Sequence, residues 1–243
     1  MTEEKMLERV RRLLDKAAHP NTPPAEADLA QAKALELAEK YAIDLAVFEH
    51  ATITATDVAV KEFFVDAPYA QEKSALLGVI AANSSGRSVR YPRDYSYGAR
   101  GRVLFKYGKG ADVAVYAMPS DLERIELLYT LLQLHATRDM LKSMPQPGED
   151  AGAHRRSFLL GFISAVDQRM WQMKQQAERD AANDTGTSTA LVLRNREDLV
   201  DEVFEKAVGK TTKAGKMSFS GSGYNAGYQS GQSADLGQQK VGA

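Results

Sequence analysis

The fold class is decided by Ser120-Asp121-Leu122-Glu123-Arg124-Ile125-Glu126-Leu127-Leu128-Tyr129 and by what lies on either side of it. Ser120 and Glu123 have the spacing of a capping box, which predicts that a helix begins here. Apolar residues then recur at helical spacing as far as Ala136, so the predicted helix is long and amphipathic. Prolines and a glycine within residues 144–148 end it.

A second long helix is predicted from Asp150 to Ala182. Small residues lie beside its apolar stripe, which consists of Phe158, Phe162, Val166, Met170 and Met173. Because only a short connection separates the two helices, we expect them to pair in antiparallel fashion.

Strand-forming residues come directly before these helices. Three strands are predicted at 88–91, 102–107 and 112–118, where β-branched and aromatic types gather. Gly108-Lys109-Gly110 predicts a tight hairpin between the last two strands. Residues 92–101 have the composition of a longer, polar and tyrosine-rich loop.

Four further elements are expected outside this central part. Residues 52–65 predict a strand, and Leu76 to Ile80 predict a short helix. Later in the chain, Ala190-Leu191-Val192-Leu193 predicts a short strand, and Asn195 begins a helix that runs through Val208.

Together these elements predict an α+β fold, with an N-terminal two-helix hairpin followed by a small, mainly antiparallel sheet packed on long antiparallel helices. The hairpin occupies residues 1–50, where a proline-rich break separates two helical patterns. The core domain spans residues 51–208. Residues 209–243 are predicted to form a flexible segment and a C-terminal helix rich in glycine and tyrosine.

That C-terminal helix has a repeat of its own. Gly223, Gly227 and Gly231 recur every four residues, and Tyr224 and Tyr228 follow the first two. The spacing places the glycines on one helical face, which predicts a short helix docked on a small-residue face of the core. A phosphate-binding role for this segment is the alternative.

The bulk composition is that of an ordinary globular protein. The chain has 243 residues, of which 44% are hydrophobic and 26% charged, and its net charge is −1. The absence of cysteine excludes disulfides, zinc ribbons and a thiol nucleophile. Neither a signal-peptide pattern nor an apolar run of membrane-spanning length is found, so we expect a cytoplasmic protein without a membrane partner.

Positive charge is concentrated in residues 87–109, here called the basic window. It holds seven basic residues against the single acid Asp94, and the rest of the chain carries 24 basic and 31 acidic residues. Guanidinium groups interleaved with phenol rings suit a phosphate backbone and unstacked bases. The alternative is a solvated hairpin whose tyrosines pack beside arginine stems. The predicted nucleic-acid-binding residues are Arg87, Arg90, Tyr91, Arg93, Tyr95, Tyr97, Arg100, Arg102, Lys106, Tyr107 and Lys109.

The remaining sequence contains no recognisable catalytic set. Phosphate-binding glycine loops, a serine-nucleophile elbow and histidine pairs at metal-ligand spacing are all missing, so no cofactor and no metal is predicted. His135 and His154 are predicted to lie on the two long helices, and antiparallel pairing would allow them to face each other across a metal or acid–base site. Surface or capping roles are the alternative.

The opening segment resembles the family known as domain of unknown function 2786. The resemblance is carried by residues 7–17, Pro20-Asn21, Ala25-Glu26-Ala27 and residues 32–41, and it covers about the first 45 residues. The rest is similar to longer phage and actinobacterial members in four segments, which are residues 120–130, 155–162, 189–193 and 221–227. The resemblance implies the domain division and a phage or mobile-element setting, and it supplies no catalytic residue.

We therefore expect an accessory protein of a phage or mobile element, not an enzyme, that binds DNA or RNA through the basic window. A protein–protein adaptor that recruits a host or phage factor is the first alternative. A hydrolase whose site forms around His135 and His154 is the second. The sequence leaves the oligomeric state open.

Overall fold

The computed structural model describes residues 54–92, 95–97, 103–105, 110–183, 187–209 and 220–236, with nine isolated positions between 12 and 33. For 92, 95–97, 103–105, 177–183 and 187–195 it describes the backbone alone. The predicted N-terminal hairpin and most of the predicted flexible segment lie outside the described residues. No helix in the described ranges is long and apolar enough to cross a membrane.

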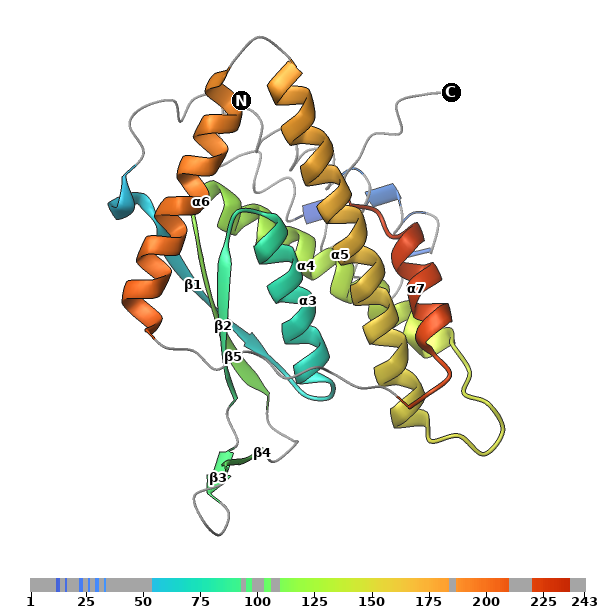
Figure 1. Ribbon diagram of the computed structural model, residues 1–243. Helices are drawn as coiled ribbons and strands as arrows, with labels where there is room; N and C mark the ends of the chain where they lie inside the picture. The colour runs from blue at the N-terminus through green and yellow to red at the C-terminus, as the bar shows by residue number, and fades with distance from the viewer. Residues whose placement is uncertain are drawn as a thin grey trace.

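A three-stranded antiparallel sheet lies at the centre of the fold (Figure 1). Its strands are β1 (Ala59–Val65), β2 (Arg87–Pro92) and β5 (Ala111–Ala117), in the order β1-β5-β2. Alternate residues of the middle strand point to opposite faces. Val113 and Val115 join the main core on the inner face, whereas Ala114 and Tyr116 join a smaller cluster on the outer face.

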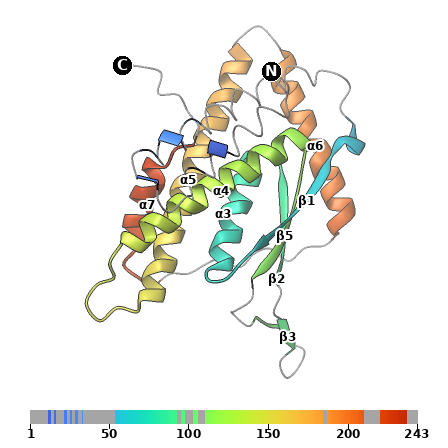
Figure 2. The ribbon, with the colours of Figure 1, turned by 180° about the vertical axis from the view of Figure 1, so that it is seen from behind.

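Four helices cover the two faces of this sheet. On the inner face lie α3 (Ala70–Asn83), α4 (Pro119–Lys142) and α5 (Ala151–Asn183), which share the main core. On the outer face lies α6 (Thr187–Val208), as Figures 1 and 2 show from opposite sides. The two long helices expected on either side of residues 144–148 are thus confirmed, and so is the α+β class.

A fifth helix, α7 (Tyr224–Ser233), packs on α5 on the side away from the sheet (Figure 1). A Cβ atom on Gly227 would lie 1.8 Å from the Phe158 carbonyl oxygen, and one on Gly161 would lie 2.0 Å from the Tyr224 carbonyl oxygen. Only glycine fits at such contacts. The four-residue glycine repeat is therefore the face by which α7 docks on the core.

Helix α6 is attached to the body by ion pairs and by an apolar cluster. Arg87 of β2 pairs with Asp201, with Nε 2.5 Å from Oδ1. The guanidinium of Arg196, only 4% exposed, donates to the Asp121 carboxylate over 3.1 Å. Lys174 of α5 pairs with Glu197. The apolar part of the contact includes Val203 and Val208, with Val200 fully buried and Phe204 edge-on to Tyr116.

Two predicted starting points were wrong for local reasons. β1 begins at Ala59 and not at 52, because the Thr54 backbone N–H and hydroxyl donate to Asp57 over 2.7 and 2.9 Å and close a 3-10 turn (η1, Ala55–Asp57). α4 begins at Pro119, where the missing N–H of proline costs nothing. Ser120 therefore caps no helix, and its hydroxyl accepts a hydrogen bond from Arg196.

Two predicted strand assignments were also wrong. Residues 190–193 belong to α6, because a run of four apolar residues does not distinguish a strand from a buried helix turn. The hairpin at Gly108-Lys109-Gly110 does not form between the strands expected to flank it. β4 (Val103–Phe105) pairs with β3 (Tyr95–Tyr97), and β5 pairs with β1 and β2.

Candidate functional site

Strands β3 and β4 form a separate two-stranded ribbon within the basic window. Figures 1 and 2 show it beyond the ends of β2 and β5, away from the helices. We call residues 93–109 the β3–β4 arm. Pro92 pairs with Ala111, and the next pair is Tyr95 with Phe105, so two residues on one side of the interruption oppose five on the other. This unequal spacing separates the ribbon from the central sheet.

Three of the predicted binding residues lie on β2 with described side chains, and they do not share one environment. Arg87 is bound by Asp201, with a second bond of 2.8 Å from its terminal nitrogen to Oδ2. Its charge is therefore already matched, and its role is to hold β2 against α6. The prediction that Arg87 is a free cation of the interface needs this correction.

Arg90 and Tyr91 are exposed at the base of the arm. Arg90 makes no hydrogen bond or ion pair with any described residue. Because neighbouring residues of a strand point to opposite faces, Arg90 and Tyr91 lie on different sides of the ribbon's base. At the base of the arm the cation Arg90 and the phenol ring of Tyr91 are thus presented on opposite faces rather than gathered on one.

An exposed aromatic residue that the sequence reasoning missed lies on the same face as Tyr91. Asp112 of β5 is paired with Phe64 on one side and Tyr91 on the other. Phe64 is 56% exposed and Tyr91 49% exposed. The adjacent pair Phe63-Phe64 in a strand is the available signal, since one of two consecutive side chains must face outward when the other is buried.

The other predicted binding residues fall outside the described side chains. Tyr95 and Tyr97 are described through their backbone alone, in β3. By sequence, Arg100 and Arg102 belong to the connection between β3 and β4. The remaining predicted residues outside the described ones are Arg93, Lys106, Tyr107 and Lys109.

His154, in the first turn of α5, is the buried centre of a polar cluster. Its Nε2 lies 2.9 Å from the Ser143 hydroxyl, and its Nδ1 lies 3.0 Å from the Ser222 hydroxyl and 3.3 Å from a Glu149 oxygen. His154 is 3% exposed. We call Ser143, Glu149, His154 and Ser222 the His154 cluster. It joins the end of α4, the start of α5 and the segment before α7.

The acceptors in the His154 cluster determine which atom carries the proton in each of its hydrogen bonds. Hydrogen bonds from the Ser222 hydroxyl (2.7 Å) and backbone N–H (2.6 Å), and from the Gln146 N–H, lower the pKa of Glu149 to about 2. An ionised carboxylate only accepts, so Ser222 uses its one proton on Glu149 and must accept from Nδ1–H of His154. In the neutral imidazole Nε2 then carries a lone pair, and Ser143 donates to it.

The predicted partnership between His135 and His154 is not seen in the described contacts. His135 contacts Asp139, with Nε2 3.1 Å from Oδ2, and its ring lies 5.8 Å from that of Phe162. Burial raises the pKa of Asp139, but a hydrogen bond from Ser230 and the charges of His135 and Arg138 outweigh it and lower the pKa overall. The two histidines thus have separate partners. Among the described residues no group of three or more potential ligands is arranged for a metal ion.

Comparison with known proteins adds a family match for the start of the chain. The family model described as a protein of unknown function (DUF2786) matches residues 5–45. No curated protein and no solved structure matches the chain.

Proposed function

We propose that this protein, whose residues 5–45 match the DUF2786 family model, binds nucleic acid. The binding surface would be the β3–β4 arm and the exposed residues at its base. The observation that carries the proposal is a two-stranded ribbon that projects from the body within the one strongly basic window of the sequence. A ribbon of this kind has the width that the major groove of duplex DNA accepts. We also infer an accessory role in a phage or mobile element, which rests on the resemblance alone.

The distribution of charge favours one mode of binding. Arg90 and Tyr91 lie on opposite sides of the ribbon's base, and five of the seven basic residues of the window fall within the arm itself. Cations on a ribbon that enters a groove can reach the phosphates of its walls. The remainder of the chain carries seven more acidic than basic residues, which favours approach by the arm first.

Salt-dependent binding is the test. Fluorescence anisotropy with a labelled duplex DNA, a duplex RNA and a single strand should show affinity that falls steeply with salt concentration. Arg90→Ala, and Arg100→Ala combined with Arg102→Ala, should weaken binding to all sequences. Each lost phosphate contact should reduce the slope of log affinity against log salt by about 0.9 on duplex DNA.

Lys142→Ala is the matched control, because it removes one charge at a side chain that is 70% exposed and far from the window in sequence. It should leave affinity and slope unchanged. The proposal fails if the wild type binds none of the three probes at low salt, or if Arg90→Ala behaves like Lys142→Ala. A protein captured from lysate that stays bound after nuclease digestion would favour the adaptor function instead.

A serine hydrolase is the second candidate, favoured by the order of protons in the His154 cluster. A hydroxyl that donates to an imidazole nitrogen is the arrangement in which histidine acts as general base. The Ser143 oxygen would attack an acyl carbon, its proton would pass to Nε2 and then to the leaving alcohol, and water would release the acid. The structural alternative is that the same bonds only fix the segment before α7.

Labelling with a fluorophosphonate separates these two roles of the His154 cluster. If Ser143 is a nucleophile, mass spectrometry should find the adduct on Ser143, and Ser143→Ala should abolish it. Ser233→Ala, an exposed serine in α7, should leave labelling unchanged. Absence of labelling in the wild type, or labelling that survives Ser143→Ala, removes the hydrolase.

A further inference from the structure

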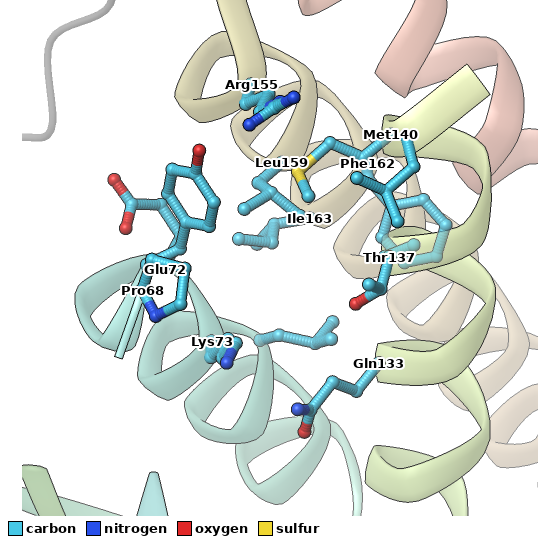
Figure 3. Close-up of a pocket in the computed structure, with 14 residues that line it drawn as sticks. Pro68, Glu72, Lys73, Gln133, Thr137, Met140, Arg155, Leu159, Phe162 and Ile163 are labelled. Atoms are coloured by element: carbon cyan, nitrogen blue, oxygen red, sulfur yellow. The ribbon is translucent and has the colours of Figure 1, made fainter. Parts of the chain in front are cut away.

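A cavity of about 220 Å³ lies between α3, α4 and α5 (Figure 3), on the far side of the sheet from α6. It is smaller than the roughly 300–1,000 Å³ of sites for drug-sized ligands, so it fits a molecule of about the size of one amino acid. The apolar residues that line it include Leu76, Met140, Leu159, Phe162 and Ile163.

One acidic residue lines this cavity without a partner. Glu72 is 7% exposed, and its carboxyl group makes no hydrogen bond or ion pair with any described residue. The first turn of α3 is a favourable position for a negative charge. The carboxylate oxygens of Glu72 nevertheless accept no hydrogen bond from a described residue. Glu72 lies among apolar lining residues and has no donor from the described residues, so a bound cationic or N–H group would find a free acceptor there.

Arg155 of α5 is the counterpart of Glu72. It also lines the cavity and makes no hydrogen bond or ion pair with any described residue. Lys73, the other cation of the lining, is already paired with Asp66 over 2.7 Å. Figure 3 shows Arg155 at one end of the cavity and Gln133 at the other, with the Glu72 carboxylate at the outer edge of the lining on the side of Arg155. No ion pair joins Glu72 to Arg155, so both charges remain for a ligand.

We propose that this cavity binds a small zwitterion with an apolar tail, of the class of the free aliphatic and aromatic α-amino acids. The ammonium group would donate to Glu72 and the carboxylate would accept from Arg155. The tail would lie on Met140, Leu159 and Phe162 and point toward Gln133. A ligand of one sign would leave one of the two groups unmatched, which is why a zwitterion fits best.

The proposal is tested with three molecules that share the isobutyl group of leucine. L-leucine carries both charged groups, 4-methylpentanoate lacks the ammonium group, and 3-methylbutylamine lacks the carboxylate. Isothermal titration of the full chain should show that L-leucine binds tightest, with each analogue weaker by roughly 10- to 100-fold, the effect of losing one charge-assisted hydrogen bond.

Two variants, one isosteric and one shortened, then test which residue binds each charged group of the ligand. Glu72→Gln should weaken L-leucine by roughly 10-fold or more and leave 4-methylpentanoate unchanged or tighter. Arg155→Gln should weaken L-leucine and leave 3-methylbutylamine unchanged or tighter. Glu62→Gln, on the outer face of the sheet, and Arg156→Gln, next to Arg155 but outside the cavity lining, are the controls.

Two results would overturn the assignment. The first is that none of L-leucine, L-methionine and L-phenylalanine binds the wild type at millimolar concentration. The second is that Glu72→Gln weakens 4-methylpentanoate as much as L-leucine, since a loss that ignores the ammonium group would come from a damaged pocket. The melting temperature of each variant without ligand distinguishes that damage from loss of a contact.

Discussion

Helices α6 and α7 both cover the body from outside, but different forces hold them. α7 meets α5 backbone to backbone, where Gly161 and Gly227 leave no room for a methyl group. α6 meets the outer face of the sheet through a small apolar cluster and three ion pairs, of which the Arg196 pair is the most buried. Close backbone contact distinguishes the attachment of α7, and ion pairs distinguish that of α6.

This difference predicts that salt weakens the attachment of α6 more than that of α7. Close packing is insensitive to salt, whereas partly exposed ion pairs are screened by it. α6 holds β2 through Asp201 and Arg87, and β2 leads directly into the β3–β4 arm. The Arg87–Asp201 pair therefore lies at the start of the strand that leads into the proposed nucleic-acid interface, whereas α7 packs on α5 on the side away from the sheet (Figure 1).

The largest effect on stability is expected where α7 packs backbone to backbone on α5. Gly227→Ala places a methyl group 1.8 Å from the Phe158 carbonyl oxygen, so α7 must move off α5. We expect a loss of roughly 3 kcal/mol in the free energy of unfolding, at the upper end of overpacking effects, measured by urea denaturation. Ala226→Ser, at an exposed position of the same helix, is the control. An unchanged midpoint would show that α7 docking contributes nothing to the cooperative fold.

Acid should weaken the attachment of α7 through the His154 cluster. Hydrogen bonds from Ser222 and Gln146 lower the pKa of Glu149 to about 2 in the folded chain, below its unfolded value of 4.5. The stabilisation from Glu149 is therefore complete above about pH 4.5 and is lost as the pH falls toward 2. Glu149→Gln should lower stability near pH 7 and make the loss between pH 4.5 and 2 less steep.

Thermal melts over that pH range measure this slope. Glu205→Gln serves as the control, because the exposed Glu205 side chain makes no hydrogen bond or ion pair with any described residue. If the slope of Glu149→Gln equals that of the wild type, Glu149 does not hold α7 in the way that its hydrogen bonds indicate.

Sequence patterns predicted the parts of this fold that depend on local periodicity. The long helices α4 and α5 follow from apolar residues at helical spacing, and the glycine repeat indicated a docked α7 before its partner was known. The pairing of β4 was missed because the tertiary structure, and not the local sequence, determines whether β4 pairs with β3 or with β5. Residues 190–193 were missed because a short apolar run carries no period.

The candidate sites were harder to predict because their members are far apart in the chain. Arg87 and Asp201 are 114 residues apart, and no local pattern shows that one neutralises the other. Ser222 lies 68 residues after His154, so no local pattern could predict the hydrogen bonds of the His154 cluster. Glu72 and Arg155 are ordinary charged residues in amphipathic helices, and only the packing of α3 against α5 places both on one cavity.

The smallest effect on stability is expected where charge alone decides, and it has a consequence for function. Asp201→Asn breaks a partly exposed ion pair and should cost about 0.2–1 kcal/mol. It also releases Arg87 at the start of β2, the strand that reaches the arm five residues later at Pro92, so duplex DNA that extends from the arm along β2 should bind more tightly and the slope of log affinity against log salt should increase by up to about 0.9. Asp198→Asn removes the same charge from an exposed position of α6 and leaves the Arg87 pair intact. Anisotropy titrations should therefore show a larger gain for Asp201→Asn, whereas equal gains would mean that Arg87 stays outside the interface even when its partner is gone.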